Sequence, residues 1–291
     1  MPQNYELNVR QLTRLLSFDL ASELEAELLI CNVIGRERAW LYAHSDYQLS
    51  ETEAQQLKKI SGQRKAGMPI AYLLGTREFY GRNFIVNADV LIPRPETELL
   101  IEQALKLPLP DDAHVLDIGT GSGCIILTLA AERPEWRCTA IDLSQAALNV
   151  AQQNQARLGL HDQAVCWLQG DLFEPLRDAN ARFDLVVSNP PYVAEGDPHM
   201  KQGDVRFEPD VALTSGDDGL DLIQKLIKQA PDFLQPNGWL MIEHGFDQSK
   251  AVKKRLKKRG FADVKAIKDL AGIKRMVKAR TSEGFLTESN D

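Results

Sequence analysis

The stretch Leu116-Asp117-Ile118-Gly119-Thr120-Gly121-Ser122-Gly123 decides the fold. It starts in an apolar run that is typical of a buried strand, and a helical pattern over 125–131 follows it. Glycines between a strand and a helix let the backbone turn tightly and approach a ligand closely. The alternative for such a loop taken alone is a tight strand–helix turn, so its meaning depends on the rest of the chain.

The rest of the chain repeats the order strand, then helix. Strand-like apolar runs occupy 115–118, 138–141, 164–168, 185–187 and 239–242, with further helical patterns over 145–158 and 220–227. This alternation predicts an α/β fold with a parallel sheet covered by helices on both faces. After a Lys- and Arg-rich helix expected at about 249–259, the runs 264–267 and 276–279 predict a closing pair of strands.

Acidic residues near the ends of these strands indicate what the loop binds. Asp142 follows Gly119 by 23 residues and ends the second strand, the position from which a carboxylate holds the hydroxyls of an adenosine ribose. Asp171, just after the third strand, could take the adenine amino group. The glycine spacing is G-x-G-x-G rather than that of dinucleotide folds, and Asp117 suits an ammonium group better than a pyrophosphate. A nucleoside that carries an amino acid, such as S-adenosylmethionine, therefore fits best.

A second loop, Ser188-Asn189-Pro190-Pro191-Tyr192, leaves the apolar run 183–187. The two prolines fix φ and push Asn189 out of the helical region. An amide side chain, backbone carbonyls and an aromatic ring are thus held rigidly together, as a binding site requires. The alternative is a stiff turn that only ends the strand.

The N-terminal part reads as a separate helical module. Ser22 followed by Glu25, and Ser50 followed by Glu53, are capping-box patterns that open helices within 1–66. The run 79–86 predicts a β-hairpin around a glycine-containing turn. We therefore expect a helical bundle for substrate docking over 1–68, a hairpin linker over 69–92 and the main domain over 93–291.

Composition and charge narrow the class of protein. The chain has 291 residues, is 44% hydrophobic and 26% charged, and carries a formal net charge of −7, which disfavours binding to phosphate backbones. The sequence has neither a signal-peptide pattern nor an apolar run long enough to span a membrane, so we expect a cytoplasmic protein. No histidine has metal-ligand spacing, and no cysteines form a C-x-x-C pair. Reduced, mostly buried thiols are expected at Cys31, Cys124, Cys138 and Cys166.

With both loops in one chain, the sequence resembles the class I S-adenosylmethionine-dependent methyltransferases, in which N-P-P-Y marks enzymes acting on amide or exocyclic amino nitrogens. Three further segments, 92–98 (Ile-Pro-Arg-Pro-Glu-Thr-Glu), 203–209 (Gly-Asp-Val-Arg-Phe-Glu-Pro) and 243–245 (Glu-His-Gly), are similar to the PrmC/HemK family. These are the glutamine N5-methyltransferases of peptide chain release factors. One departure is Leu172, where some members carry a Trp against the adenine.

The resemblance implies a fold, a reaction and a set of site residues. The fold is a Rossmann-like, mostly parallel seven-stranded sheet with a closing antiparallel strand. The reaction methylates the glutamine of the Gly-Gly-Gln loop in class I release factors, which act in translation termination; it needs no metal, no membrane and no direct DNA binding. The expected cofactor-binding residues are Asp117, Gly119, Thr120, Gly121, Ser122, Gly123, Asp142, Leu143, Asp171, Leu172 and Asn189. Substrate binding falls to Asn189, Pro190, Pro191 and Tyr192, of which Asn189, Pro190 and Tyr192 are the catalytic candidates.

The side-chain oxygen of Asn189 and the carbonyl of Pro190 are both acceptors, and together they could hold the two N–H bonds of an amide while Tyr192 packs on its plane. Alternatives are glutamine methylation of ribosomal protein L3, methylation of adenine N6 in nucleic acid, and a non-catalytic cofactor-binding scaffold. Structural roles are favoured for Glu243 and His244. Arg206 and Glu208 could form an ion pair within the loop that follows the site, and the basic helix could be a solvated face or a contact surface.

Overall fold

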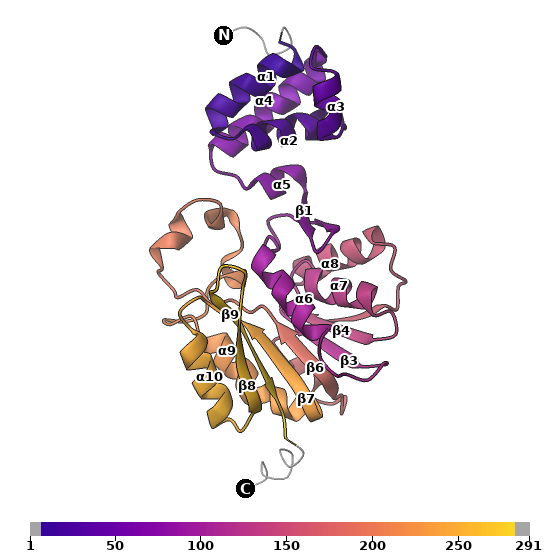
Figure 1. Ribbon diagram of the computed structural model, residues 1–291, viewed down its shortest axis with the longest axis vertical. Coiled ribbons are helices and arrows are strands. Elements are labelled where there is room, and N and C mark those ends of the chain that lie inside the picture. The colour runs from indigo at the N-terminus through magenta and orange to yellow at the C-terminus, as the bar shows by residue number, and fades with distance from the viewer. Residues whose placement is uncertain (1–6, 283–291) are drawn as a thin grey trace. The chain divides into compact units, whose positions relative to one another are not determined.

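The computed structural model describes residues 7–282 (Figure 1). The described chain divides into two compact units. One comprises 7–76 together with His199–Phe207, and the other comprises Arg77–Pro198 together with 208–282. Each has a hydrophobic core built from its own residues.

The first unit contains the helices α1 (Val9–Leu20), α2 (Glu23–Ile34), α3 (Arg38–Ala43), α4 (Glu51–Lys65) and α5 (Ile70–Leu74). Leu12, Leu29, Ile30 and Leu57 are fully buried where α1, α2 and α4 meet. Both ends of the Ser50–Glu53 capping box form, as predicted. At Ser22 only half of the predicted box forms: the hydroxyl accepts from the Glu25 amide, but the Glu25 carboxylate binds elsewhere.

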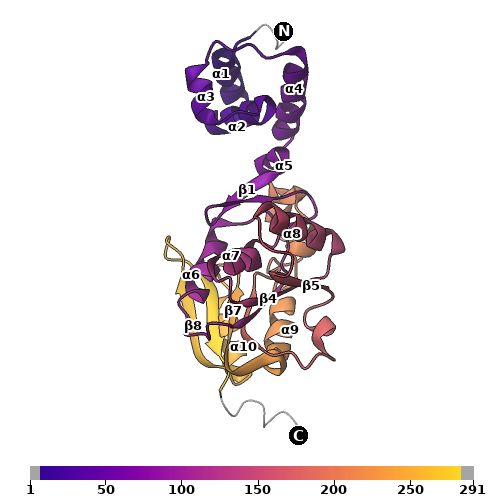
Figure 2. The same ribbon diagram turned by 90° about the vertical axis from the view of Figure 1, so that its right-hand side faces the viewer.

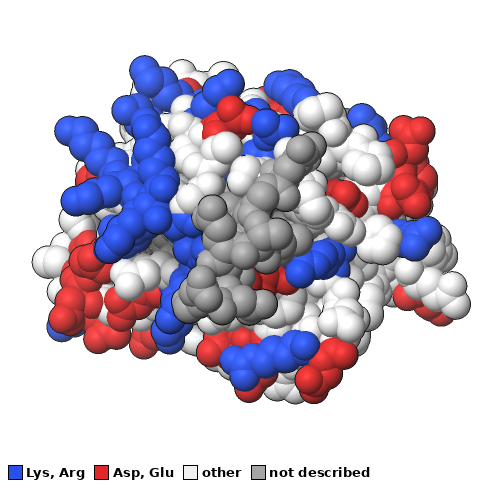
Figure 3. All heavy atoms as spheres, turned by 90° about the horizontal axis from the view of Figure 1, so that it is seen from below, with Lys and Arg blue, Asp and Glu red and all other residues white. Residues whose placement is uncertain are grey.

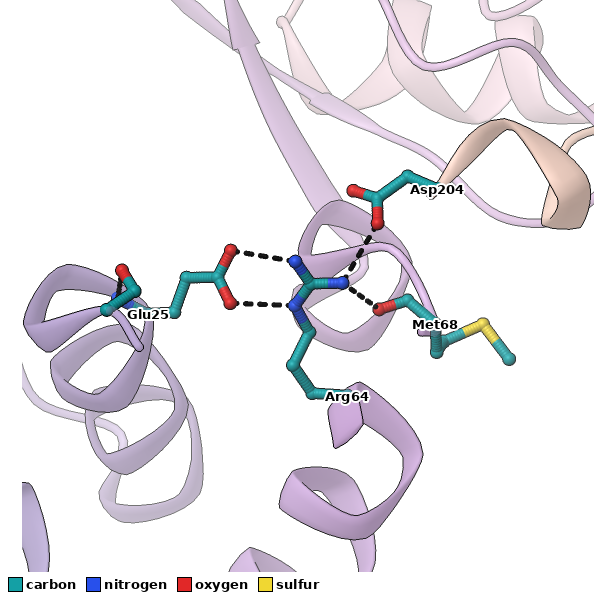
Figure 4. A network of polar contacts seen from close by, with 5 residues as sticks. Glu25, Arg64, Met68 and Asp204 are labelled. Carbon is teal, nitrogen blue, oxygen red and sulfur yellow. Dashed lines mark hydrogen bonds and ion pairs between the residues drawn. The ribbon is translucent and has the colours of Figure 1, made fainter. Parts of the chain in front are cut away.

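The Glu25 carboxylate binds Arg64, which lies near the end of α4. The Arg64 side chain joins three parts of this unit (Figure 4). Its guanidinium donates to both oxygens of Glu25, at 2.7 and 3.0 Å. It also donates to the carbonyl oxygen of Met68 at 3.1 Å and to Asp204 at 2.9 Å. A planar guanidinium can hold these acceptors at once because it presents five donors. Arg64 thereby fixes the returning segment His199–Phe207 to the helices.

The second unit begins with the predicted hairpin, β1 (Thr76–Phe79) and β2 (Arg82–Ile85), followed by a 3₁₀ turn over Pro95–Thr97 and α6 (Glu98–Ala104). Phe79 and Phe84 are buried in the core. The side chain of Asn154 bonds both backbone groups of Ile85 and donates to the Ser122 carbonyl, so the hairpin is attached to the Gly-rich loop.

The sheet of this unit has, within residues 77–282, seven strands in the order β5-β4-β3-β6-β7-β9-β8. The strands are β3 (His114–Ile118), β4 (Arg137–Asp142), β5 (Val165–Gln169), β6 (Phe183–Ser188), β7 (Leu234–Glu243), β8 (Ala262–Lys268) and β9 (Lys274–Arg280). Strands β3 to β7 pair in parallel with their neighbours in this order, whereas β9 is antiparallel to both β7 and β8. The predicted mostly parallel sheet with an antiparallel closing strand is confirmed.

Helices cover both faces of the sheet (Figures 1 and 2). One core packs α6 and α7 (Cys124–Glu132) against the sheet, with α8 (Gln145–Arg157) beside them. On the other face lie α9 (Asp221–Gln229) and α10 (Ser249–Lys258). None of the helices described between residues 7 and 282 is long and apolar enough to cross a membrane.

The register of β3 and β6 places the two loops singled out from the sequence beside each other. Ile118 pairs with Ser188, the last residues of two adjacent parallel strands. The Ser188 hydroxyl also donates to the Ile118 carbonyl at 2.7 Å. The strand order reverses between these strands, and ligands of open α/β sheets bind in the crevice at such a point.

Candidate active site

A cavity of about 410 Å³ lies at the carboxyl ends of the parallel strands, within the second unit. Its walls come from the Gly-rich loop after β3, the end of β4, the loop after β5 and the loop after β6. Residues just before α6 and on the segment 211–222 complete it. The lining is mainly apolar, with a few polar groups, as in sites that bind small molecules.

Asp142 joins the end of β4 to the Gly-rich loop. Its Oδ2 accepts from the Gly121 amide at 2.8 Å, and its Oδ1 accepts from the Ser144 amide at 2.9 Å. A carboxylate has about four lone-pair sites, so both oxygens can accept further hydrogen bonds from a ligand. Burial raises the pKa of Asp142, while these amides act in the opposite direction.

Gly123, the last glycine of the loop, is required by packing. Its φ is +78°, and a Cβ there would lie 2.9 Å from Leu127 and 3.1 Å from the Ala151 side chain. Side chains are therefore excluded where the loop passes into α7 between these neighbours.

Asp117 is fully buried beside the same loop. The Thr120 hydroxyl donates to its Oδ2 at 2.7 Å, whereas Oδ1 has no hydrogen-bond partner among the described residues. Burial raises the pKa of this carboxyl to about 7, and the hydrogen bond from Thr120 only partly counters the shift. A buried carboxyl with a free oxygen is suited to a cationic ligand group, whose charge would favour ionisation.

Asn189 lies in the cavity wall with its amide held from behind. Its Nδ2 donates to the Thr97 hydroxyl oxygen at 3.1 Å, and Thr97 is itself buried. The other end of the amide, Oδ1, is buried and has no partner among residues 7–282. Unpaired buried acceptors are costly, so this oxygen marks a place where a ligand can donate a hydrogen bond.

Tyr192, by contrast, points into the protein rather than lining the cavity. Its hydroxyl donates to Glu243 Oε1 at 3.3 Å, and burial raises the pKa of the phenol well above its ordinary value. Its backbone carbonyl accepts from Gln248 Nε2 at 2.9 Å. A Cβ on Gly219 would lie 2.2 Å from that carbonyl, so glycine is required for this close approach.

Most of the predicted cofactor- and substrate-binding residues line one cavity. They are Gly119, Thr120, Gly121, Ser122, Asp142, Leu143, Asp171, Leu172, Asn189, Pro190 and Pro191. Asp117, Gly123 and Tyr192 lie behind this lining. Sequence reasoning missed Thr97, Ser144 and the wall supplied by Val211, Ala212, Thr214 and Ser215. Thr97 stood within the family-like segment 92–98, but nothing local indicated that its hydroxyl meets Asn189.

The ion pair between Arg206 and Glu208, one of the possibilities that the sequence left open, does not form. Glu208 pairs with Arg94 at 2.5 Å and accepts from the Ile92 amide at 3.1 Å, so it holds the segment that carries Thr97. Arg206 donates to the Ala66 carbonyl within the first unit. These partners are 114 to 140 residues apart in the sequence and could not be inferred from the spacing of the two residues.

The basic helix α10 lies away from the cavity lining. Figure 3 shows Lys and Arg side chains gathered on one side of the face seen from below. A shallow groove is lined by Lys228 on α9 and by Lys254, Arg255, Lys258 and Arg259. Within the described part of the chain, no group of three His, Cys, Asp or Glu residues could hold a metal ion.

Comparisons with known proteins bear on the family and the fold of the chain. The family model described as the PrmC N-terminal domain matches residues 9–75, and that of the methyltransferase small domain matches 95–204. Among solved structures, a methyltransferase from Pyrococcus furiosus superposes with a TM-score of 0.52 at 19% identity, covering 77% of this chain and 98% of that one. At that identity the likeness concerns the fold alone.

Curated relatives are much more similar in sequence. A release factor glutamine methyltransferase from Bordetella pertussis is 46% identical over 87% of this chain and 93% of that protein. The protein of the same name from Shewanella oneidensis is 42% identical over 86% of each chain. Relatives of this identity match most of the chain, and the chain therefore belongs to the family of release factor glutamine methyltransferases.

Proposed function

We propose that this enzyme transfers the methyl group of S-adenosylmethionine to the side-chain amide nitrogen of the glutamine in the Gly-Gly-Gln loop of class I release factors. The observation that carries the proposal is the Asn189 side chain, which lines the cavity and whose Oδ1 is buried and unpaired among the described residues. An acceptor there meets the need of a primary amide, which must present two N–H groups to its site.

The residues present fit S-adenosylmethionine. Asp142 retains lone pairs that can accept hydrogen bonds from ribose hydroxyls, and Asp171 and Leu172 lie in the same wall on the side of β5. The free Oδ1 of Asp117 suits the ammonium group of the amino-acid part, directly or through water. Bound there, the cofactor supplies an electrophilic methyl group on a sulfonium sulfur.

The protein's contribution to the reaction is orientation and charge stabilisation. An amide nitrogen is a weak nucleophile because its lone pair is delocalised into the carbonyl. Asn189 Oδ1 and the Pro190 carbonyl would accept its two N–H bonds and direct the nitrogen toward the methyl group. As the N–C bond forms and the S–C bond breaks, the nitrogen becomes positive and its N–H bonds become more acidic. The two acceptors then bind more strongly, and one proton is lost to solvent afterwards.

A metal is unnecessary, because the sulfonium leaves as a neutral thioether that needs no Lewis acid.

We assign docking of the release factor to the helical unit. Its exposed apolar side chains include Leu15, Phe18, Leu24 and Tyr42, the kind that protein contacts cover.

The test is transfer of labelled methyl from S-adenosylmethionine to a purified release factor, beside a Gln→Ala variant of its Gly-Gly-Gln loop and duplex DNA. Label on the unmodified factor alone is the expected result. Label on DNA would replace the proposal with adenine methylation. If neither accepts label, ribosomal protein L3 becomes the first substrate to examine and the release-factor assignment is overturned.

A further inference from the structure

Helix α10 carries a block of positive charge in a chain that is acidic as a whole. The segment 249–259 contains seven Lys and Arg residues and no Asp or Glu, whereas the formal net charge of the chain is −7. Four pairs of these cations stand four residues apart, and like charges at that spacing destabilise a helix. The helix dipole favours the cations of the last turn, but not Lys250, Lys253 and Lys254. The stability of α10 therefore does not explain its charge.

The buried side of α10 shows which of its side chains are available to a partner. Val252 and Leu256 are fully buried in the core that α10 shares with α9. The apolar face of the helix is thus already covered by the protein, and it cannot enter a lipid bilayer as the apolar face of a membrane-surface helix does. What α10 offers to a partner is its charged face.

Five exposed lysines on α9 and α10 form a surface that we call the lysine patch: Lys228, Lys250, Lys254, Lys257 and Lys258. The four on α10 fall within about 100° of the helix circumference, so they share one face. Lys228, Lys254 and Lys258 line the groove between the two helices. The Arg259 Nε donates to the Lys228 carbonyl at 3.2 Å and joins the ends of α9 and α10.

The groove of the lysine patch lies toward the amino ends of the strands, away from the cavity. Both helices run back from the carboxyl ends of the parallel strands, and Lys228 stands at the end of α9. Lys228 also lines a second hollow together with Arg182, which directly precedes β6, and with Asp232. No member of the patch lines the cavity. A ligand on the patch would therefore not compete with the cofactor or with a substrate amide.

The chemistry of the patch favours the phosphate backbone of a duplex. Arg255 is engaged by Asp218 at 3.7 Å, whereas residues 7–282 form no ion pair with the five lysines. Arginine matches the planar geometry of carboxylates, while lysine is a point charge that contacts phosphate from any direction. The groove lining has no aromatic side chain on which an unpaired base could stack.

The packing of α10 favours RNA over DNA. A helix that reads DNA enters a major groove about 12 Å wide, which α10 cannot do because it is packed against α9, β8 and β9. Its lysines can contact phosphates only from outside the duplex. In A-form RNA the major groove is narrow, so the phosphates of its two strands stand close together along its edges. The row from Lys250 to Lys258 extends about 12 Å along the helix axis and can reach both edges.

We propose that the lysine patch binds the phosphate backbone of double-stranded RNA without reading its sequence. This interaction is separate from the proposed methyl transfer, no step of which uses these lysines. It leaves the cavity open, so the enzyme can hold an RNA and its protein substrate at the same time.

The experiment measures the binding of a fluorescent RNA duplex of about 16 base pairs to the full chain by anisotropy. For two to four phosphate contacts, Kd should rise about 10- to 100-fold between about 50 and 200 mM salt. The triple variant Lys228→Gln, Lys254→Gln, Lys258→Gln should bind at least about 10-fold more weakly at the lower salt, with a salt dependence reduced by about one contact for each lysine.

The matched control is Lys58→Gln, Lys59→Gln, Lys201→Gln, which makes the same change in net charge with exposed lysines of the first unit. It should bind the RNA as wild type does, and equal weakening in the two triple variants would overturn the proposal. Thermal unfolding should show that both variants are folded. Methylation of a release factor should be unchanged in the patch variant, since its three lysines lie outside the cavity lining.

Two competitors identify the class of partner. A DNA duplex of the same sequence should bind more weakly than the RNA, and polyglutamate of equal charge should displace the RNA poorly. Equal or tighter binding of DNA would overturn the assignment to RNA, and ready displacement by polyglutamate would replace RNA with an acidic protein. Absence of RNA binding by wild type at about 50 mM salt would overturn the proposal outright. None of these results bears on methyl transfer, which is tested separately by labelling of the release factor.

Discussion

At the scale of single residues, the protein leaves two buried oxygens unpaired in the wall of the cavity or behind it. Asp117 Oδ1 and Asn189 Oδ1 lie at opposite sides of the junction between β3 and β6, and both are buried without a partner among residues 7–282. The first is part of a titratable group, and the second belongs to a neutral amide. This difference separates a site for a cation from a site for amide N–H donors.

Replacing Asn189 by Ala should stop catalysis without affecting the cofactor. The variant loses the acceptor that orients the glutamine amide, and we expect kcat to fall about 100-fold or more. Cofactor affinity, measured by calorimetry, should stay within a few-fold of wild type. Unchanged turnover would exclude the role given to this side chain.

Replacing Asp142 by Ala should weaken cofactor binding, in contrast to the Asn189 variant. Asp142→Ala removes a carboxylate that both binds the ribose in our proposal and holds the Gly121 and Ser144 amides. We expect the cofactor Kd to rise about 10- to 100-fold, since two charge-assisted hydrogen bonds are lost. Asp142→Asn keeps one acceptor oxygen, so its cofactor Kd should lie between those of wild type and Asp142→Ala. Wild-type affinity in Asp142→Ala would refute the ribose assignment.

Asp117 should couple cofactor binding to pH. Its folded-state pKa of about 7 exceeds the ordinary value of 3.8, so the ligand-free enzyme loses stability from this group as pH rises through that window. An ammonium group beside Asp117 favours the ionised form, and cofactor binding should therefore release protons between about pH 5.5 and 7. Calorimetry in two buffers of different ionisation enthalpy measures that release. Asp117→Asn should abolish it, and proton release that persists in this variant would contradict the assignment.

At the scale of elements, the sequence predicts what is local and misses what is distant. The strands and the two loops follow from apolar runs, glycines and prolines that act within a few residues. The position of Asp142 could be predicted because its separation in sequence from the Gly-rich loop is typical of a βαβ unit. Thr97 could not, since it meets Asn189 across 92 residues. The Ser22 capping box failed for the same reason: Arg64, 39 residues from Glu25, competes for the carboxylate.

The contacts of Arg64 predict a local effect on the returning segment His199–Phe207. Arg64→Ala removes hydrogen bonds to two carboxylates and the Met68 carbonyl, and should destabilise the first unit by about 1–3 kcal/mol. The segment should also become more sensitive to limited proteolysis, located by mass spectrometry. Lys65→Ala is the control, because its ion pair with Asp19 is largely exposed and should contribute less than about 1 kcal/mol. Equal protease sensitivity in the two variants would show that Arg64 does not anchor the segment.

At the scale of the whole molecule, the three segments that mark the family surround the acceptor loop or connect to it through the chain. Arg94 and Glu208 fix the segment with Thr97, Glu243 receives the Tyr192 hydroxyl, and Gly245 is bonded to Gln248, which holds the Tyr192 carbonyl. Between Asn189 and Glu208 the chain leaves the second unit and passes through the first. The chain therefore runs from the loop to which we assign substrate binding directly into the first unit.

Removing the helical unit should separate substrate docking from chemistry. A chain beginning at Arg77 keeps both hydrophobic cores of the second unit and every residue of the cavity lining, so it should bind S-adenosylmethionine with near wild-type affinity. It loses the surface to which we assign docking. We therefore expect kcat/KM to fall at least about 10-fold further for an intact release factor than for a short Gly-Gly-Gln peptide. The ratio of kcat/KM for the release factor to kcat/KM for the peptide, measured in one enzyme preparation, does not depend on the fraction of active enzyme. An unchanged ratio would show that the second unit recognises the release factor without the helices.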